Sequence, residues 1–543
     1  MMIDPGAASP PPAAARVSAW SPLALPVFRK LWLVWVTANV CMWMHDVAAA
    51  WLMTKLVGTP GWVALVQTAS TLPVFLLGLA SGALADIVDR RRYLMATQVW
   101  VAAVATLTCL VLLAGAMTPA LLLVLTFANG VGLAMRWPVF AALVPEVVPR
   151  AQLPPALALN GIAMNASRVI GPVAAGALIA TAGTLWVFAL NAVLSVAAVV
   201  ALWRWRREVH AKTLPAERFV GAIRVGVQHA RQNPRLKVVL LRVWLFFMQS
   251  TALLALLPLV AMALEGGNAG SFTLLLACMG GGAVFAAVQL TWLRERMSFD
   301  ALVLWGSLLQ AAATVVVAFA PSVWVAAPAM LVAGMAWISV ANSLTISAQF
   351  ALPDWVRARG MSIYQMALMG GAAVGAALWG QVAGLTGLHA ALLLSAVAGL
   401  VVVLATRRLS IEAGVGEDLT PAPLPPPPVP AGAGAIDAQA GPVLVSIEYL
   451  IDPADAEAFR AVMRDTRRAR LAQGVLSWWL FGDTARPGRY VEYFVDESWV
   501  EHLRRFDRMT AADHALRERR NALHRGSAPP QVTRSLATAV DAG

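Results

Sequence analysis

Ionisable residues are rare inside the long apolar runs of this chain, and each one is a candidate for chemistry. They are His45 and Asp46 in the first run, Arg136 in the fourth, Arg168 in the fifth and Arg242 in the seventh. A charged side chain at the centre of a bilayer costs at least about 2.5–3.5 kcal/mol, so such residues are functional candidates by default. A carboxylate there can take up and release a proton, and a nearby arginine can tune that exchange.

The depth of these residues in the membrane decides which of them can pair. At about 1.5 Å per residue, Asp46 lies roughly 22 Å from the inner face, Arg168 roughly 17 Å and Arg136 only about 10 Å. Asp46 and Arg168 are therefore the better-matched pair. We predict that Asp46 is a proton-coupling site, with Arg168 as its partner and His45 as a relay. A buried ion pair that only orients the helices is the alternative.

The remaining polar and aromatic residues of the runs could line a cavity. Arg136 would form a separate positive site there, whereas Arg242 lies near the end of its run and can reach the membrane interface. The other predicted lining residues are Asn160, Asn165, Trp137, Gln249, Asn342, Tyr364 and Gln365, with Trp43, Trp244 and Trp337 as further aromatic wall. A roomy cavity with few fixed charges suits a bulky apolar, amphipathic or cationic small molecule.

The elements that must position these residues are the apolar runs themselves. Of the 543 residues, 59% are hydrophobic and 13% are charged, whereas soluble domains carry about 25% charged residues. About 20 apolar residues cross a bilayer. The runs are 31–54, 61–84, 93–116, 119–143, 157–181, 185–205, 238–263, 269–293, 299–320, 322–347, 360–384 and 388–406. This pattern predicts an all-α membrane protein with twelve transmembrane helices in two six-helix bundles, followed by a small α+β domain.

Basic clusters recur on one side of these runs. Arg90–Arg92, the segment 204–237 and Arg407/Arg408 fall on that side, whereas the other side offers little beyond Lys55 and Glu265. The positive-inside rule makes the basic side and both termini cytoplasmic, and we expect a bacterial-type cytoplasmic (inner) membrane. The net charge of +12 is scattered over these loops, so it does not indicate a nucleic-acid partner.

Composition divides the chain into six regions. We expect a cytoplasmic tail, a six-helix bundle, a cytoplasmic linker, a second six-helix bundle, a Pro/Ala/Gly-rich linker and a cytoplasmic domain, at 1–27, 28–206, 207–237, 238–408, 409–441 and 442–540. The linker 207–237 has apolar residues at helical spacing between arginines. It predicts an amphipathic helix, either on the membrane surface or exposed to solvent.

Two motifs in the first bundle resemble those of the major facilitator superfamily. "GALADIVDRRRYL" (82–94) resembles its signature in the loop between spans 2 and 3. "SRVIGPVAAG" (167–176) is similar to the signature of drug/proton antiporters, although Ser167 and Ala175 stand where glycines are usual. The matching positions of the second motif are Gly171, Pro172 and Gly176.

The longer stretch "LALNGIAMNASRVIGP" resembles the exporter branch called transmembrane secretion effectors, which includes enterobactin exporters. The resemblance covers roughly residues 20–410. It implies a proton-coupled exporter of hydrophobic small molecules, such as drugs, secondary metabolites or siderophores, that works by alternating access. A facilitator or importer of the same fold remains open, because direction is not written in the fold.

The loop segment 82–94 combines an acid with a cluster of bases. Asp86 can accept hydrogen bonds from helix N-terminal amides and from arginine. We therefore expect a conformational latch formed by Gly82, Asp86, Arg90, Arg91 and Arg92. The alternative is a plain basic anchor on the cytoplasmic side, which needs the arginines alone.

The C-terminal segment reads β-α-β-β-α-β, which is the order of a ferredoxin-like module. It resembles the antibiotic-biosynthesis-monooxygenase type of dimeric α/β barrel. An enzyme would use Trp478, Trp479, His502 or His514 on a bound aromatic or haem. Because the segment has no metal spacing or nucleophile–base pair, we favour a binding or dimerisation module with His502 and Arg505 on a solvated face. No catalytic residue, metal or cofactor is predicted, and a membrane-tethered sensor or monooxygenase is the alternative for the whole chain.

Overall fold

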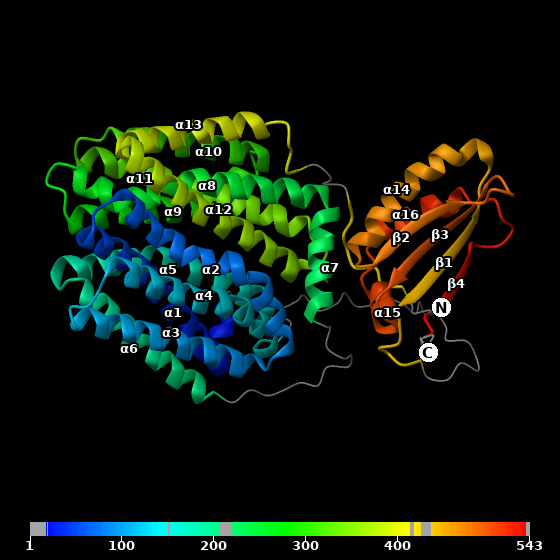
Figure 1. Ribbon diagram of the computed structural model, residues 1–543, viewed down its shortest axis with the longest axis horizontal. Helices are drawn as coiled ribbons and strands as arrows, with labels where there is room; N and C mark the ends of the chain where they lie inside the picture. Colours follow the sequence, from blue (N-terminus) through cyan, green and yellow to red (C-terminus); the bar gives the residue numbers. More distant parts are fainter. Residues whose placement is uncertain are drawn as a thin grey trace, which may run out of the picture.

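A computed structural model describes residues 18, 20–149, 152–205, 219–412, 417–424 and 436–538. Within these residues, twelve helices of 19 to 31 residues form two bundles of six (Figure 1). The first bundle contains α1 (Pro26–Leu56), α2 (Pro60–Ile87), α3 (Arg90–Leu113), α4 (Pro119–Val147), α5 (Leu153–Thr181) and α6 (Thr184–Trp203). The second contains α8 (Pro234–Ala263), α9 (Ala269–Arg294), α10 (Phe299–Ala318), α11 (Val323–Phe350), α12 (Arg357–Thr386) and α13 (Leu388–Thr406). A short 3-10 helix, Ser21–Ala24, precedes them.

Short polar residues and prolines set the helix starts. The Asp89 side chain accepts a hydrogen bond from the amide of Arg92 at the start of α3, and Asn233 accepts one from Leu236 at the start of α8. Such caps satisfy amides that the first turn leaves without partners. Proline begins α1, α2, α4 and α8, where its missing amide hydrogen removes no helical bond.

Eleven helices of the described part of the chain are long and apolar enough to cross a membrane. The twelfth long helix, α1, is not among them; it carries Asn39, His45 and Asp46 in its middle. It nevertheless packs along α5 and α6 inside the first bundle. The predicted twelve spans are therefore eleven apolar helices and one more polar helix packed among them.

The two bundles share a core at one end only. We call the end that carries Arg90–Arg92 the basic end. At the opposite end, one apolar cluster joins both bundles, and the rings of Trp51 and Phe272 stack across it with centroids 5.6 Å apart. At the basic end each bundle has its own cluster, around Leu143 in the first and Leu344 in the second. The bundles therefore share a core at the opposite end, whereas at the basic end their cores are separate and α2 contacts α12 at Gly82 and Ser362.

Helix α7 (Phe219–Gln232) crosses the basic end, between the bundles and the C-terminal domain (Figure 1). Its Val225 and Ala230 are buried, and it packs against α2, α8, α12 and α14. The helix is the predicted one, but neither predicted environment, the membrane surface or solvent, is the observed one. Its apolar face is covered by protein rather than by membrane lipid or solvent.

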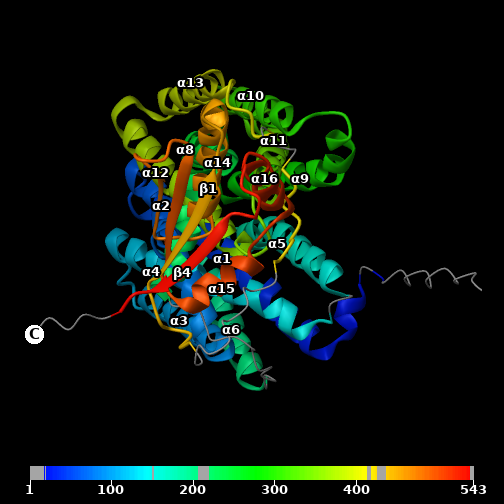
Figure 2. The same cartoon turned by 90° about the vertical axis from the view of Figure 1, so that its right-hand side faces the viewer.

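The C-terminal domain is a four-stranded antiparallel sheet with helices on one face. Its elements are β1 (Val443–Leu450), α14 (Ala456–Ala472), β2 (Ser477–Gly482), β3 (Arg489–Asp496), α15 (Trp499–Asp507), α16 (Ala511–Ala522) and β4 (Gln531–Leu536). The strand order is β2-β3-β1-β4, and Ile447 of β1 pairs with Glu492 and Val532. The predicted element order is confirmed, with the last helical region divided in two. Figure 2 shows the strands in front of the bundles.

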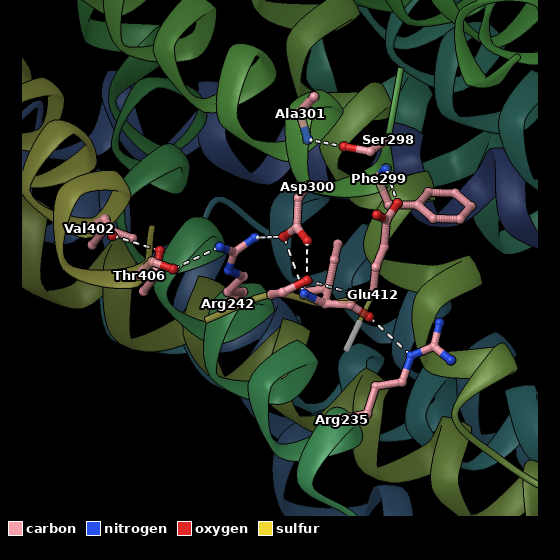
Figure 3. A network of polar contacts seen from close by, with 11 residues as sticks. Arg235, Arg242, Ser298, Phe299, Asp300, Ala301, Val402, Thr406 and Glu412 are labelled. Atoms are coloured by element: carbon pink, nitrogen blue, oxygen red, sulfur yellow. Dashed lines mark hydrogen bonds and ion pairs between the residues drawn. The ribbon is translucent and has the colours of Figure 1, made fainter. Parts of the chain in front are cut away.

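Parts of the linker predicted at 409–441 are bound to folded elements. The Ala422 amide donates to the Met509 carbonyl (2.9 Å) and the Leu424 amide to that of Phe506 (3.1 Å). Residues 410–412 attach to the second bundle, where the Ser410 hydroxyl donates to Asp300 (2.6 Å) and Glu412 accepts from the Phe299 amide (2.6 Å) (Figure 3).

Arg242 lies in the same network and corrects an expectation. It forms an ion pair with Asp300 (2.7 Å) and donates to the Thr406 carbonyl (2.7 Å) (Figure 3). Its side chain is buried, so it does not extend to the membrane interface. It instead joins α8, α10 and α13 at the basic end.

Candidate functional site between the two bundles

Asp46 is a carboxylate in the middle of α1 that lies against α2. Its Oδ1 accepts a hydrogen bond from the Ser70 hydroxyl (2.9 Å), and its side chain is half-buried. No arginine, lysine or histidine of the described residues lies within ion-pair distance of it. The predicted ion pair between Asp46 and Arg168 is therefore absent from this arrangement.

Arg168 binds aromatic rings from both bundles instead. Its guanidinium lies 4.5 Å from the ring centroid of Trp337 on α11 and 5.5 Å from that of Trp43 on α1. Its Nε has no hydrogen-bond partner among the described residues. Arg168 is thus a cation held by cation–π contacts across the two bundles, which strengthen where water is excluded. Sequence reasoning found Arg168 but missed the ring that it contacts.

A second aromatic contact crosses the bundles nearby. Phe75 of α2 and Trp244 of α8 meet edge to face with centroids 5.8 Å apart, and Trp337 meets Phe247 in the same way at 5.4 Å. Trp43, Trp244 and Trp337 therefore lie where the bundles meet, and their role as the wall of a cavity stays a prediction. Trp137 instead packs on the core of the first bundle.

His45 points away from Asp46. It is fully buried, its ring meets Phe188 of α6 edge to face at 5.3 Å, and neither ring nitrogen has a hydrogen-bond partner among the described residues. Successive residues of a helix point about 100° apart. His45 is therefore not hydrogen-bonded to Asp46, and the predicted relay is not assembled here.

Three predicted cavity residues are packed inside single bundles. Arg136 is buried in the first bundle, 5.7 Å over the Trp35 ring, beside a cavity of about 10 Å³. Tyr364 is buried in the second, with its hydroxyl 3.0 Å from that of Thr345, and Gln249 is buried against Gly399 of α13. These three do not line a space between the bundles.

The remaining polar candidates are less deeply packed. Asn160, Asn342 and Gln365 are half-buried, and the carbonyl oxygens of the Asn160 and Gln365 side chains have no donor among the described residues. The side chain of Asn165 lies outside the described residues.

The glycines of the span 5 motif allow close helix packing. A Cβ on Gly171 would come within 2.5 Å of the Trp43 Cβ on α1. A Cβ on Gly176 would overlap the Thr273 side chain on α9, in the other bundle. Pro172 lies inside α5 between them. The motif therefore places α5 against one helix of each bundle.

Two arginines of the loop motif are bound within the first bundle. Arg90 forms an ion pair with Glu146 of α4 (2.7 Å), and Arg91 donates to the Trp203 carbonyl at the end of α6 (2.8 Å). Gly82 faces Ser362 of α12 at ordinary contact distance. Asp86 lies in the last turn of α2, and its side chain is outside the described residues. The latch role of Asp86 stays a prediction.

Trp478 and His514 of the C-terminal domain have structural partners, whereas the side chain of Trp479 has no hydrogen-bond partner among the described residues. Trp478 donates to Glu492 (2.9 Å), Trp479 is exposed, and His514 Nε2 lies 2.8 Å from the Ala422 carbonyl.

His502 and Arg505 are buried, so the predicted solvated face is wrong. His502 Nδ1 lies 2.7 Å from Asp496, and its Nε2 accepts from Arg534 (3.2 Å). Burial lowers the pKa of His502 below its ordinary value although Asp496 raises it. Both nitrogens of the neutral ring are therefore occupied.

The fold and this site together define a membrane transporter of the major facilitator superfamily. The chain belongs to the transmembrane secretion effector family, whose model matches residues 17–541 and so extends through the C-terminal domain. No curated protein matches the chain.

Solved structures support the transporter fold. The nucleoside transporter NupG is 12% identical, with a TM-score of 0.56 over 70% of this chain and 98% of its own. A POT family transporter in complex with a thioalcohol-conjugated peptide is 12% identical, with a TM-score of 0.58 over 70% of this chain and 95% of its own. A bacterial homologue of the human lysosomal transporter Spinster, inward-facing and occupied, is 13% identical, with a TM-score of 0.56 over 72% and 98%.

Proposed function

We propose that this transporter is a proton-coupled exporter of hydrophobic or amphipathic small molecules across a bacterial-type inner membrane, with its basic end and both termini in the cytoplasm. The observation that carries the proposal is Asp46, a half-buried carboxylate in the middle of a membrane helix, which accepts a hydrogen bond from the Ser70 hydroxyl. A carboxylate without a cationic partner gains and loses a proton at a small free-energy cost when its access to water changes.

The arrangement of the cores supports alternating access. The bundles share one apolar core at the opposite end and have separate cores at the basic end. With the basic end in the cytoplasm, the separate cores there favour access from the cytoplasm, and the α2–α12 contact at Gly82 has to widen to admit substrate. Export then requires the α5–α9 contact at Gly176 to open and the basic end to close.

The contacts of Arg168 restrict the substrate class. Its guanidinium lies among tryptophan rings without a carboxylate among the described residues. A fixed positive charge in a site of low dielectric repels cations strongly. We therefore propose that the substrates are apolar or anionic molecules with an aromatic or other flat surface. Cationic molecules are excluded from this substrate class.

The test is transport by reconstituted vesicles. We would screen amphipathic compounds for those that dissipate an imposed proton gradient with the wild-type protein, and then compare Asp46→Asn with Asp46→Glu. We expect Asn to abolish substrate-dependent proton movement and Glu to retain part of it. Full proton movement with Asp46→Asn would overturn the coupling role. Substrate accumulation in the opposite direction would favour an importer.

We also propose that the C-terminal domain pairs with a second copy through the outer face of its sheet. Trp479 is 62% exposed and Phe481 is 52% exposed on that face, which is unusual for isolated domains. Sedimentation of the Trp479→Glu variant in detergent tests this, and an unchanged dimer fraction would contradict it.

A further inference from the structure

The C-terminal domain contains a half-open cavity that the transport cycle does not use. It has a volume of about 170 Å³ and lies between the inner face of the sheet and the helices α14, α15 and α16. Val445, Ile447 and Phe494 of the sheet form one wall, and Phe506 and Leu516 of the helices lie opposite. An apolar cavity of about 150 Å³ holds a benzene ring, so this one has room for a single ring and a small head group.

Five arginines from four different elements also line this cavity: Arg470, Arg505, Arg517, Arg520 and Arg534. Asp513 is the carboxylate of the lining, and its Oδ2 is occupied by the amide (2.9 Å) and the hydroxyl (2.8 Å) of Thr510, in the cap of α16. The charge of the cavity wall is therefore strongly positive.

Two of the arginines are neutralised by carboxylates that lie outside the cavity lining. Arg470 pairs with Glu492 (3.1 Å) and Arg505 with Asp496 (3.4 Å), and both guanidinium groups lie over the Phe494 ring. Burial raises the pKa of Glu492, but Arg470 and Arg520 outweigh it and hold the pKa below its ordinary value. Glu492 is thus ionised and engaged with Arg470, Trp478 and Tyr449.

Among the described residues, Arg520 has no carboxylate at ion-pair distance, because Glu492, which it helps to keep ionised, is bound by Arg470. It is only 6% exposed, its Nη1 donates to the neutral Thr466 hydroxyl (3.3 Å), and its Nε has no partner in the described part of the chain. No carboxylate of the described residues forms an ion pair with Arg520, Arg517 or Arg534. Buried charges are normally paired, so an anion in the cavity would complete this group.

We propose that the cavity binds a small aromatic carboxylate, with the carboxylate on Arg520 and the ring against the apolar wall of the sheet. A planar guanidinium binds a carboxylate with two parallel hydrogen bonds, and the apolar side chains of Val445 and Ile447 in the cavity wall suit a flat ring. The proposed role of the site is binding, and His502 beside it is held by Asp496 and Arg534.

Calorimetric titration of the full-length protein in detergent tests this proposal. The probe is benzoate, and the comparators are benzamide and benzylamine, which present the same ring with a neutral or a positive head group. We expect benzoate to bind at least tenfold more tightly than either comparator. No binding of benzoate, or equal affinity for all three compounds, would overturn the proposal.

Matched variants locate the binding. Arg520→Gln should weaken benzoate binding at least tenfold, whereas Arg519→Gln, an exposed neighbour on α16 outside the cavity wall, should leave it unchanged. Arg517 is exposed and lines the cavity, so Arg517→Gln decides the question if the Arg520 variant does not fold; it should weaken binding severalfold. Equal effects of the Arg519 and Arg520 variants, or loss of benzoate binding in Arg168→Gln instead, would contradict this location.

Discussion

At the scale of single residues, the sequence predicted that Asp46 and Arg168 lie within membrane helices but did not predict their partners. Arg168 and Asp46 were predicted to lie at similar depths, but the Ser167 hydroxyl lies 3.4 Å from the Val36 carbonyl, so Asp46 lies farther along α1 than Arg168 does. Their directions depend on helix rotation and on residues far along the chain. Trp337 lies 169 positions beyond Arg168, and the Ser70 hydroxyl gives Asp46 a partner on α2. Local spacing contains no information on either contact.

The Arg168–Trp337 contact predicts an effect of removing the ring. Trp337→Leu should lower substrate affinity or transport about tenfold or more, because a desolvated cation–π contact contributes about 2 kcal/mol. The control is Trp324→Leu on the same helix, where the ring is 76% exposed. Transport rates in vesicles measure both. Equal losses of transport in the two variants would show that removing any tryptophan ring from α11 has this effect, and would contradict the role of the Arg168–Trp337 contact.

His502 predicts a dependence of domain stability on pH. Burial lowers its pKa below the ordinary value of 6.5, so the unfolded chain takes up the proton first as the pH falls. The stabilisation is complete above about pH 6.5 and is lost as the pH decreases below it. Protease resistance of the C-terminal domain in the full chain should therefore fall between pH 7 and 5. The His502→Gln variant should show a smaller fall, and an identical fall would count against this assignment.

At the scale of elements, patterns with strong periodicity were predicted well and contacts between elements were not. Alternating residues of β1 predicted a strand, and the observed inward residues Val445, Ile447 and Tyr449 follow that alternation. The amphipathic pattern of 219–232 predicted α7, but such a pattern does not identify the elements that pack on the apolar face. Buried Arg242 shows the same limit, since its partner Asp300 comes from another helix.

Helix α5 gives the prediction at this scale. Gly176→Val should prevent the close approach of α5 to Thr273 on α9 and disfavour the present arrangement by about 1–3 kcal/mol, the usual cost of overpacking. The readout is thiol labelling of an Ile179→Cys variant, because Ile179 is buried in the shared core. The background variant lacks Cys41, Cys109 and Cys278. Labelling should increase with Gly176→Val and stay low with Ala177→Val, which faces outward. Low labelling in both would contradict the closing role of this contact.

At the scale of the whole molecule, the C-terminal domain is attached to the basic end of the bundles. Arg224 of α7 pairs with Glu497 (2.5 Å), and the Arg508 guanidinium lies 5.1 Å over the ring of Trp355, between α11 and α12. Arg508 also donates to the carbonyl of Gln473 (3.0 Å), which lines the arginine-rich cavity. The composition of the chain predicted the separate domain, but its docking depends on these long-range contacts.

Trp355 predicts how that docking is maintained. Trp355→Ala should release the domain from α7 and reduce the amide protection of residues 219–232 in hydrogen exchange on the full chain. Arg224→Glu should have a smaller effect, because a partly exposed ion pair contributes about 0–1 kcal/mol. The double variant Arg224→Glu with Glu497→Arg should restore the amide protection. Unchanged protection of α7 in Trp355→Ala would show that other contacts hold the domain.

The central claim is that Asp46 carries the proton that drives transport. The most direct measurement compares two modes of the Asp46→Asn variant in vesicles, using a compound that the wild-type protein transports. We expect the variant to lose uphill transport driven by a pH gradient and to keep exchange of labelled for unlabelled substrate, which needs no proton. Uphill transport at the wild-type rate would contradict the account.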